Sequence, residues 1–155
     1  MAYVVETLAD AEALVGKELG LTDWMLIDQN RINLFADATD DHQWIHVDPE
    51  RAAKEFPLGR TCAHGYLTLS LIPALIEDVV EFVGLERLIN YGINKVRFRT
   101  LVPSDSKIRL RTFLKSARKR AGALQVILDC RFEMEGEKKP VATAEIIVMY
   151  FLVGV

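Results

Sequence analysis

The stretch Gly65-Tyr-Leu-Thr-Leu-Ser-Leu-Ile-Pro-Ala-Leu-Ile76 decides how the rest of the chain must fold. Nearly every position from Tyr66 onward is apolar, which predicts a helix without a charged face. Such a helix belongs inside a protein, because a surface helix keeps one polar side. It is also too short to cross a bilayer. We therefore expect a buried central helix around which the remaining chain is arranged.

The second half of the chain predicts the layer that covers this helix. Four long segments are rich in β-branched residues and largely alternate between apolar and polar positions, as strands do: residues 93–100, 106–117, 123–133 and 141–153. Consecutive strands of this length, divided by short turn-like separators, predict an antiparallel meander. One face of its sheet needs an apolar cover. The expected fold class is α+β, a long antiparallel sheet wrapped around one central buried α-helix.

The first half is helical in pattern, apart from a short strand expected over residues 21–28. Residue types that cap helix starts mark three expected helices: Asp10 before a helix through Leu19, Asp28 before a helix over 29–40, and Asp48 before Pro49 and a helix over 49–56.

The composition restricts the class of protein. A chain of 155 residues has the size of one domain, so we expect a single domain over residues 1–155. Its net charge of −3 provides no basic field for nucleic acid. The first residues contain an acid and no basic leader, so no signal peptide is expected. Two cysteines, Cys62 and Cys130, form no disulfide or metal-binding pattern, and we expect reduced thiols in a cytoplasmic protein.

Residues 39–48, Thr-Asp-Asp-His-Gln-Trp-Ile-His-Val-Asp, combine charge with large apolar side chains. Asp40 and Asp41 fall at the C-terminal end of the expected 29–40 helix, where the helix dipole disfavours negative charge. Such a break of a local rule is typical of a functional site. If the chain leaves the helix at Gln43-Trp44, Asp41 and His46 can converge on one water. A carboxylate and an imidazole that share a water form a general acid–base pair.

Three other interpretations of these residues are open. The carboxylates could be no more than a solvated helix end. A metal site could use Asp41, His42, His46 and Asp48, although no further cluster of Cys or His supplies the remaining ligands. Cys62 and His64 could form a nucleophilic pair, but residues two apart tend to point in opposite directions and no orienting third group is evident.

Residues 35–53, Phe-Ala-Asp-Ala-Thr-Asp-Asp-His-Gln-Trp-Ile-His-Val-Asp-Pro-Glu-Arg-Ala-Ala, resemble the hydratase motif of the MaoC-like, (R)-specific enoyl-CoA hydratase/dehydratase family. Residues 61–73 resemble that family's His-Gly start of a central helix, and residues 91–98 resemble its following strand. Gln43-Trp44 in place of Asn-Pro resembles the nodulation protein N-like branch. Two positions depart from the family pattern: Asp40 stands where Gly is usual, and Pro73 lies near the place of a helix serine.

The resemblance implies a hot-dog fold that forms homodimers or dimers of dimers. It implies hydration of trans-2-enoyl-CoA to (R)-3-hydroxyacyl-CoA, with Asp41 as the base. His46 would hold the water and pass a proton toward Cα, and the Gly65 backbone N–H would bind the developing oxyanion. No metal or separate cofactor is expected, since coenzyme A is part of the substrate, and neither nucleic acid nor a membrane is expected as a partner. The expected substrate-binding residues are Gln43, Trp44, His64, Tyr66, Ser70, Asn94 and Arg97.

Several of these residues also have a purely structural interpretation. His64 could order the turn, and Ser70 could bond its own helix backbone. Trp44 could roof an acyl tunnel or pack in the core. The cations Lys95, Arg97 and Arg99 alternate on one strand, where they could meet CoA phosphates or form a solvated face.

Two other functions remain possible on this fold, because fold alone does not determine chemistry. A hot-dog thioesterase would hydrolyse the same thioesters, but that class commonly uses a carboxylate on the central helix. Glu77 and Asp78 occur only at the end of that helix. The second is a non-catalytic subunit that binds acyl thioesters, against which the intact Asp41/His46 pair argues.

Overall fold

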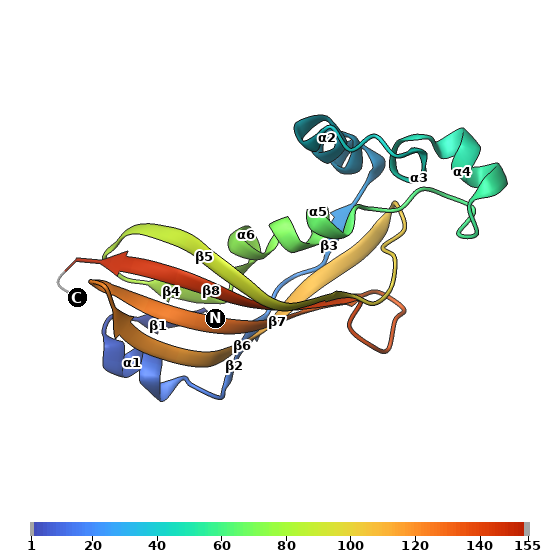
Figure 1. Ribbon diagram of the computed structural model, residues 1–155. Coiled ribbons are helices and arrows are strands. Elements are labelled where there is room, and N and C mark those ends of the chain that lie inside the picture. The colour runs from blue at the N-terminus through green and yellow to red at the C-terminus, as the bar shows by residue number, and fades with distance from the viewer. Residues whose placement is uncertain (1, 154–155) are drawn as a thin grey trace.

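The main sheet of the protein has six strands, and the computed structural model describes it within residues 2–153 (Figure 1). Two further strands, β1 (Tyr3–Val5) and β4 (Val80–Phe82), form a separate parallel pair. The strands of the main sheet are β2 (Glu18–Leu21), β3 (Met25–Ile27), β5 (Leu85–Phe98), β6 (Ser106–Arg120), β7 (Ala123–Met134) and β8 (Ala142–Leu152). The helices are α1 (Leu8–Ala13), α2 (Gln29–Thr39), α3 (Trp44–Val47), α4 (Pro49–Glu55), α5 (Gly65–Ser70) and α6 (Ile72–Ile76).

The order of the main sheet is β2-β6-β7-β8-β5, with β3 also paired to β6, and every pairing in it is antiparallel. The expected simple meander is therefore wrong for β5, which pairs with β8 rather than with β6. The reason lies in the segment after β5. The N–H of Ala63 bonds the Val102 carbonyl at 2.8 Å, and the Ser104 N–H bonds the Thr61 carbonyl at 2.9 Å. These contacts hold residues 99–105 against the segment before α5, so this part of the chain carries β5 across to β6 without forming a hairpin turn between them.

The expected central helix consists of two short helices, α5 and α6, separated at Leu71. Pro73 follows this break in the first turn of α6, where its missing N–H costs little. Both helices lie against the sheet, but not every side of them is covered. Leu67, Leu71 and Ile72 are buried, whereas the Tyr66 side chain is 67% exposed. The expectation of a helix buried on all sides is wrong for the single chain.

The N-terminal region also differs from the expectation. Thr7, not Asp10, is the N-cap of α1, and Asp10 completes a capping box by accepting from the Thr7 N–H at 2.8 Å. The helix ends before Gly16, whose φ of 84° favours glycine, so Leu19 belongs to β2. The strand expected over residues 21–28 is divided between β2 and β3.

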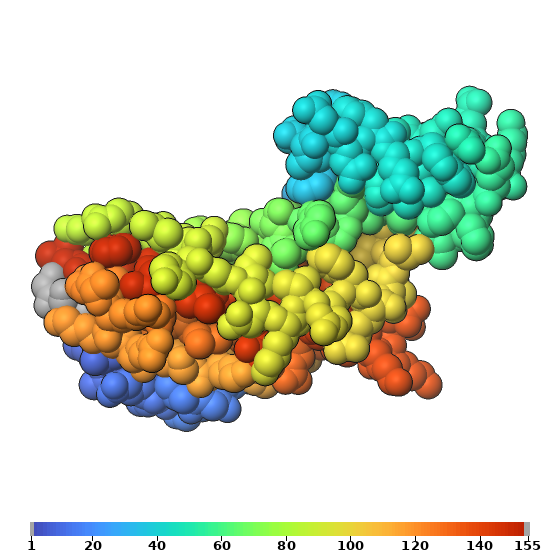
Figure 2. All heavy atoms as spheres, in the orientation of Figure 1, coloured from blue at the N-terminus to red at the C-terminus, as the bar shows by residue number. Residues whose placement is uncertain are grey.

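The segment that carries α2, α3 and α4 projects from the body of the sheet (Figures 1 and 2). Its two expected N-caps are confirmed: Asp28 accepts from the Arg31 N–H at 2.8 Å, and Asp48 accepts from the Arg51 N–H at 3.0 Å. Asp40 ends α2 in the left-handed conformation, with φ 57° and ψ 20°. The chain therefore turns sharply before Asp41. Within residues 2–153, no helix is long and apolar enough to cross a membrane.

The conformation of Asp40 generates a prediction about stability. Asp40→Gly should raise the free energy of unfolding by about 0.5–1 kcal/mol, because relief of a left-handed penalty of about 1–2 kcal/mol outweighs the extra entropy that glycine loses on folding. Urea unfolding measures the change. The control is Ala38→Gly two residues earlier, which should lower stability by roughly 1 kcal/mol because Ala38 is helical. Equal losses in both variants would contradict the assigned turn.

Candidate active site

His46 is fixed by a backbone group rather than by another side chain. Its Nδ1 lies 2.7 Å from the carbonyl oxygen of Cys62, and the Cys62 N–H returns a bond to the Ile45 carbonyl at 3.0 Å. A carbonyl oxygen can only accept, so Nδ1 must carry the proton. In the neutral ring Nε2 is then left with a free lone pair, and His46 presents a proton acceptor on its other side.

His64 lies between His46 and Phe35. Its ring stacks on the His46 ring at a centroid distance of 3.8 Å with an interplanar angle of 27°, and it lies 5.0 Å from the Phe35 ring. The side chain is only 3% exposed. Its Nε2 donates to the backbone carbonyl of Asp41 at 2.9 Å, while its Nδ1 has no partner among residues 2–153. His64 therefore connects α2, the start of α3 and the start of α5.

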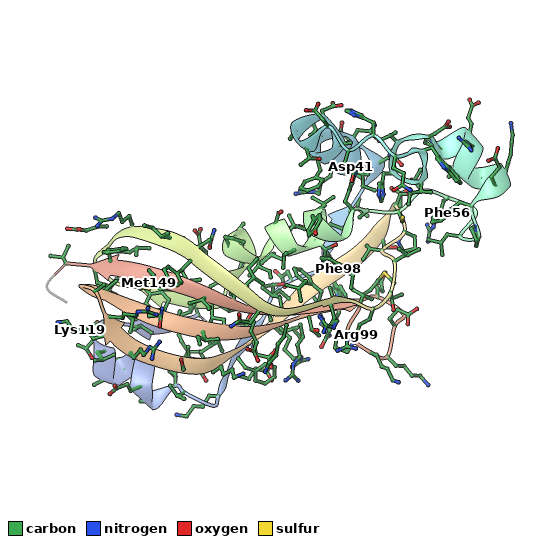
Figure 3. The ribbon with its side chains drawn as sticks, in the orientation of Figure 1. Asp41, Phe56, Phe98, Arg99, Lys119 and Met149 are labelled. Carbon is green, nitrogen blue, oxygen red and sulfur yellow. The ribbon has the colours of Figure 1, made fainter. Side chains whose placement is uncertain are left out.

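Asp41 meets this stack from the turn that Asp40 produces. Its carboxylate oxygen lies 3.8 Å from His64 Nε2, and its side chain is 53% exposed. Figure 3 labels Asp41 in the projecting α2–α4 segment. One polar atom from each of Asp41, His46 and His64 lies within 4.8 Å of the others. The structure thus brings together a solvent-accessible carboxylate and a buried imidazole, as the spacing of Asp41 and His46 suggested.

The surroundings of His46 favour its neutral form. Burial lowers the pKa of the His46 imidazole, and the neighbouring His64 lowers it further. The Cys62 carbonyl and the Asp41 carboxylate act in the opposite direction, but burial is the largest effect. The neutral ring with a protonated Nδ1 is therefore the resting state near neutral pH.

The structure supports neither a nucleophilic Cys62/His64 pair nor the expected metal site. The Cys62 thiol lies 3.8 Å from His46 Nδ1 rather than beside His64, and burial raises its pKa, which disfavours the nucleophilic thiolate. Of the expected metal ligands, His42 pairs with Asp37 at 2.9 Å and Asp48 caps α4, so neither joins the cluster. His46 and His64 are stacked face to face, so their nitrogens cannot both direct in-plane lone pairs at one ion.

The expected substrate-binding residues are spread over a wider region. Trp44 packs edge-on against Phe56 at 5.9 Å and beneath the Arg51 guanidinium, which lies 4.3 Å from the ring, so it does not roof the cavity beside α5 and α6. The Ser70 hydroxyl donates to the Tyr66 carbonyl at 2.6 Å. The remaining polar positions are exposed: Gln43 before α3, and Asn94 and Arg97 on β5.

Three residues of the site carried no signal, or only a weak one, in the sequence. The Gln29 side-chain amide donates to the His46 carbonyl at 2.7 Å, and the Thr61 hydroxyl donates to the Gln29 side-chain oxygen. Phe35, the aromatic residue at the start of the quoted motif, supports His64. Gln29 lies 17 residues from His46, and no local pattern links the two.

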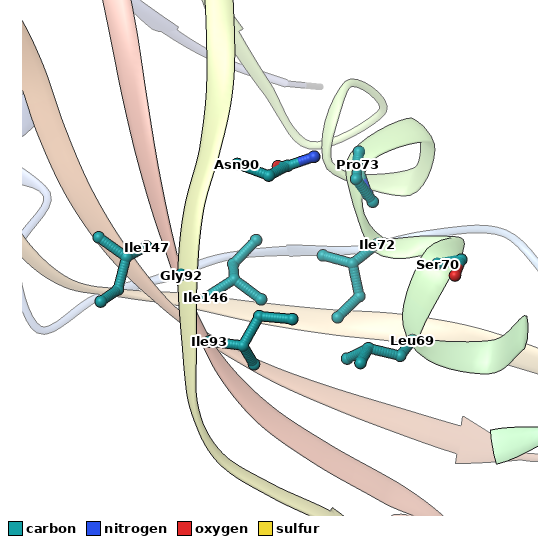
Figure 4. Close-up of a pocket in the computed structure, with 9 residues that line it drawn as sticks. All are labelled: Leu69, Ser70, Ile72, Pro73, Asn90, Gly92, Ile93, Ile146 and Ile147. Atoms are coloured by element: carbon teal, nitrogen blue, oxygen red, sulfur yellow. The ribbon is translucent and has the colours of Figure 1, made fainter. Parts of the chain in front are cut away.

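Two cavities flank α5. The first, of about 280 Å³, lies between the α5–α6 pair and strands β5 and β8, and its lining is mostly apolar (Figure 4). It includes Leu69, Ser70, Ile93 and Ile146. The second, of about 220 Å³, surrounds Gly65 and is bounded by Phe98 and Thr100. An apolar chain fits the first cavity, and the second lies against the start of α5.

Comparison with known proteins gives the family. The pattern of the MaoC-like domain matches residues 10–129. The chain is 47% identical over 146 residues to 3-hydroxyacyl-thioester dehydratase Z of Mycobacterium tuberculosis, covering 94% of this chain and 96% of that protein. It is 46% identical over 145 residues to Nodulation protein N of Rhizobium meliloti, covering 89% and 87%. The chain belongs to the MaoC-like dehydratase family.

The fold agrees with that membership. An R-hydratase of Pseudomonas aeruginosa, solved without ligand, superimposes with a TM-score of 0.70 over 88% of this chain and 81% of that one, at 24% identity. The architecture is the hot-dog fold, as the sequence resemblance implied. The family match and the name of the M. tuberculosis relative identify the protein as a hydro-lyase.

The lowered pKa of His46 makes stability depend on pH. The unfolded chain binds a proton at this residue more readily than the folded one, so its contribution is complete above about pH 6.5 and is lost as the pH falls through the lowered folded value. His46→Gln should therefore flatten the fall of unfolding free energy between pH 7 and pH 5, measured by urea unfolding.

The matched control is His42→Gln. Asp37 raises the pKa of His42, so its contribution is present below about pH 6.5 and is lost as the pH rises through the raised value. Removing it should steepen the same profile. A profile that the His46 substitution leaves unchanged would show that the buried ring titrates as it does in the unfolded chain.

Proposed function

We propose that this protein adds water across the double bond of trans-2-enoyl thioesters to give (R)-3-hydroxyacyl thioesters, and catalyses the reverse dehydration. The observation that carries the proposal is the cluster that joins the accessible Asp41 carboxylate to buried His46, whose Nδ1 is held by the Cys62 carbonyl and whose Nε2 is left as an acceptor. Polar atoms of the two residues lie within 4.8 Å of each other, so two acceptors here can hold the two hydrogens of one water. The name of the M. tuberculosis relative, a 3-hydroxyacyl-thioester dehydratase, supports the same reaction in reverse.

The two groups divide the proton transfer between them. Asp41 takes one proton from the water while the water oxygen forms a bond to Cβ of the substrate. Nε2 of His46 accepts a hydrogen bond from the other hydrogen of the water and so orients the water oxygen. The electron pair of the double bond moves toward the thioester carbonyl. Nε2 of His46 starts without a proton. The proton that Asp41 takes from the water must therefore pass to Nε2 before His46 can deliver it to Cα. The second hydrogen stays in the product hydroxyl.

The start of α5 supplies the group that stabilises the enolate oxygen in this proposal. No acceptor within residues 2–153 takes a hydrogen bond from the Gly65 N–H, which is free for a thioester carbonyl. A Cβ on Gly65 would lie 2.9 Å from the Phe98 ring, so a larger residue at this position would force that ring to move. The acyl chain would extend into the apolar cavity of Figure 4, between α5–α6 and β5.

A thioesterase reading has less support from the geometry. Glu77 and Asp78, the carboxylates at the end of the central helix, are exposed beyond α6. Neither belongs to the cluster of Asp41, His46 and His64.

Removal of either acceptor should slow hydration strongly. Asp41→Asn keeps the shape of the side chain but loses its basicity, and kcat should fall by roughly 10²–10⁴-fold, the range expected for acid–base catalysis. His46→Gln should have an effect of the same order. The measurement is the spectrophotometric loss of enoyl-CoA over several chain lengths, with chiral analysis of the product.

Asp37→Asn and His42→Gln are the controls, since these residues form an exposed ion pair outside the cluster. Both variants should keep kcat within about twofold of the wild-type value. A twofold change corresponds to much less activation free energy than the roughly 1.36 kcal/mol of a tenfold change. Full activity of folded Asp41→Asn would refute the proposed mechanism. Release of free thiol by the wild-type protein, without hydration, would favour a thioesterase.

The exposed edge of β5 leads us to propose a homodimer. Ile89 and Tyr91 are 47% and 57% exposed on this long outer strand, and an uncovered apolar edge is an aggregation hazard. Edge-to-edge pairing of two β5 strands would cover it.

Sedimentation equilibrium at micromolar concentration should therefore give the mass of a dimer. Ile89→Asp should shift the equilibrium toward monomer, because it places a carboxylate in the paired edge. The control Val4→Asp, at an exposed apolar position of β1, should remain dimeric. A stable monomer of the wild-type chain would contradict the proposal.

A further inference from the structure

The Gln29 side chain joins three segments of the chain that meet at His46. Gln29 is the first residue of α2, and its amide nitrogen lies 2.7 Å from the His46 carbonyl oxygen in α3. Its side-chain oxygen accepts a hydrogen bond from the hydroxyl of Thr61, in the segment before α5. The same amide nitrogen lies 2.8 Å from the Asn33 side-chain oxygen, one turn along α2. Both amide hydrogens and the oxygen of Gln29 are therefore in use.

The partners of this amide determine which way it points. The His46 carbonyl can only accept a hydrogen bond, so the amide nitrogen of Gln29 must face it. The reverse orientation would bring two oxygens that only accept within 2.7 Å of each other. The amide oxygen then faces Thr61, whose hydroxyl must donate. Thr61 is only 1% exposed, so solvent does not replace Gln29 as its partner.

These contacts form a closed hydrogen-bond network around His46. Thr61 is followed in the chain by Cys62, whose carbonyl oxygen lies 2.7 Å from His46 Nδ1. The network runs from the His46 carbonyl through the Gln29 and Thr61 side chains, and then along one peptide unit back to the His46 ring. The backbone of His46 is held at one end of this network and its imidazole at the other. Loss of the link in the middle would free the two ends to move relative to each other.

The network lies outside the two cavities beside α5. Within the part of the chain that the structure describes, residues 2–153, neither Gln29 nor Thr61 lines either cavity. Their influence on a reaction would therefore act through His46, whose Nε2 is the acceptor of the neutral ring. Loss of the network should change the rate of the chemical step and leave the binding of an acyl chain nearly unchanged.

We propose that Gln29 and Thr61 are positioning residues for catalysis, an inference that rests on the proposed function. Together they hold His46 so that its Nδ1 meets the Cys62 carbonyl and its Nε2 stays an acceptor for the water. Without the network, the ring can turn away from the carbonyl, and the tautomer with its proton on Nε2 becomes populated. That tautomer offers the water a donor where the reaction needs an acceptor.

Kinetics of matched variants test the catalytic part of the proposal. Gln29→Met keeps the length of the side chain and Thr61→Val keeps its shape, but each removes the hydrogen bond between them. Each should lower kcat by about 10-fold to 100-fold with KM within about twofold, since a small misplacement of a catalytic group has an effect of this size. Thr61→Ser keeps the hydroxyl and should keep nearly the wild-type kcat. The control Asn33→Ala removes the exposed partner of the same amide and should leave both constants unchanged.

The double variant Gln29→Met/Thr61→Val separates positioning from stability. It should lose little more kcat than either single variant, because the two side chains act as one unit. Replacing both partners by apolar groups costs less stability than leaving one partner alone, so this variant remains testable where a single variant does not fold. Urea unfolding shows which variants are folded under the assay conditions.

Nitrogen-15 NMR of the histidine-labelled variants provides the readout that a loss of stability alone would not move. At pH 8 the folded Gln29→Met and Thr61→Val proteins should show a mixture of the two neutral His46 tautomers. Thr61→Ser and Asn33→Ala should keep the proton on Nδ1. Wild-type kcat in the folded variants, or a lowered kcat with an unchanged tautomer, would overturn the inference. A wild-type protein without hydration activity would instead reject the proposed function, and with it the catalytic role of the network.

Discussion

The hydrogen bond from His46 Nδ1 to the Cys62 carbonyl is the contact on which the site depends. At 2.7 Å it fixes which nitrogen carries the proton, and so it leaves Nε2 as the acceptor of the neutral ring. Burial of the ring lowers its pKa and keeps it neutral. The backbone bond from Cys62 to Ile45 ties the segment before α5 to α3, so one pair of contacts aligns both the imidazole and the helix that begins at Gly65.

The projecting α2–α4 segment holds this geometry through side chains rather than through the sheet. Phe35 and His64 form a stack against the His46 ring, and Gln29 bonds the His46 backbone. The Asp40 turn then directs Asp41 to the exposed side of the stack. A buried imidazole and an accessible carboxylate thus meet at the boundary between the packed interior and solvent.

Local patterns predicted much of this structure, and the largest error concerns a contact distant along the chain. The local errors were smaller: Thr7 rather than Asp10 caps α1, and the central helix breaks at Leu71. Alternation marked the four long strands, although β5 begins at Leu85 rather than at the expected residue 93, and residue type gave the N-caps Asp28 and Asp48. The pairing of β5 with β8 has no local signature, because strand pairing depends on where residues 99–105 cross. In the site, the spacing of Asp41 and His46 was visible in the sequence. The Cys62 carbonyl was not, since every residue has a carbonyl and only the fold selects one.

The tautomer of His46 tests the central claim most directly. Nitrogen-15 NMR of the histidine-labelled protein at pH 8, with His46 assigned by comparison with His46→Gln, reports which ring nitrogen carries hydrogen. The structure predicts a protonated Nδ1 and an unprotonated Nε2, because the Cys62 carbonyl can only accept. A proton on Nε2, or an imidazolium that persists at pH 8, would contradict the account, since neither form offers the free acceptor that the shared water requires.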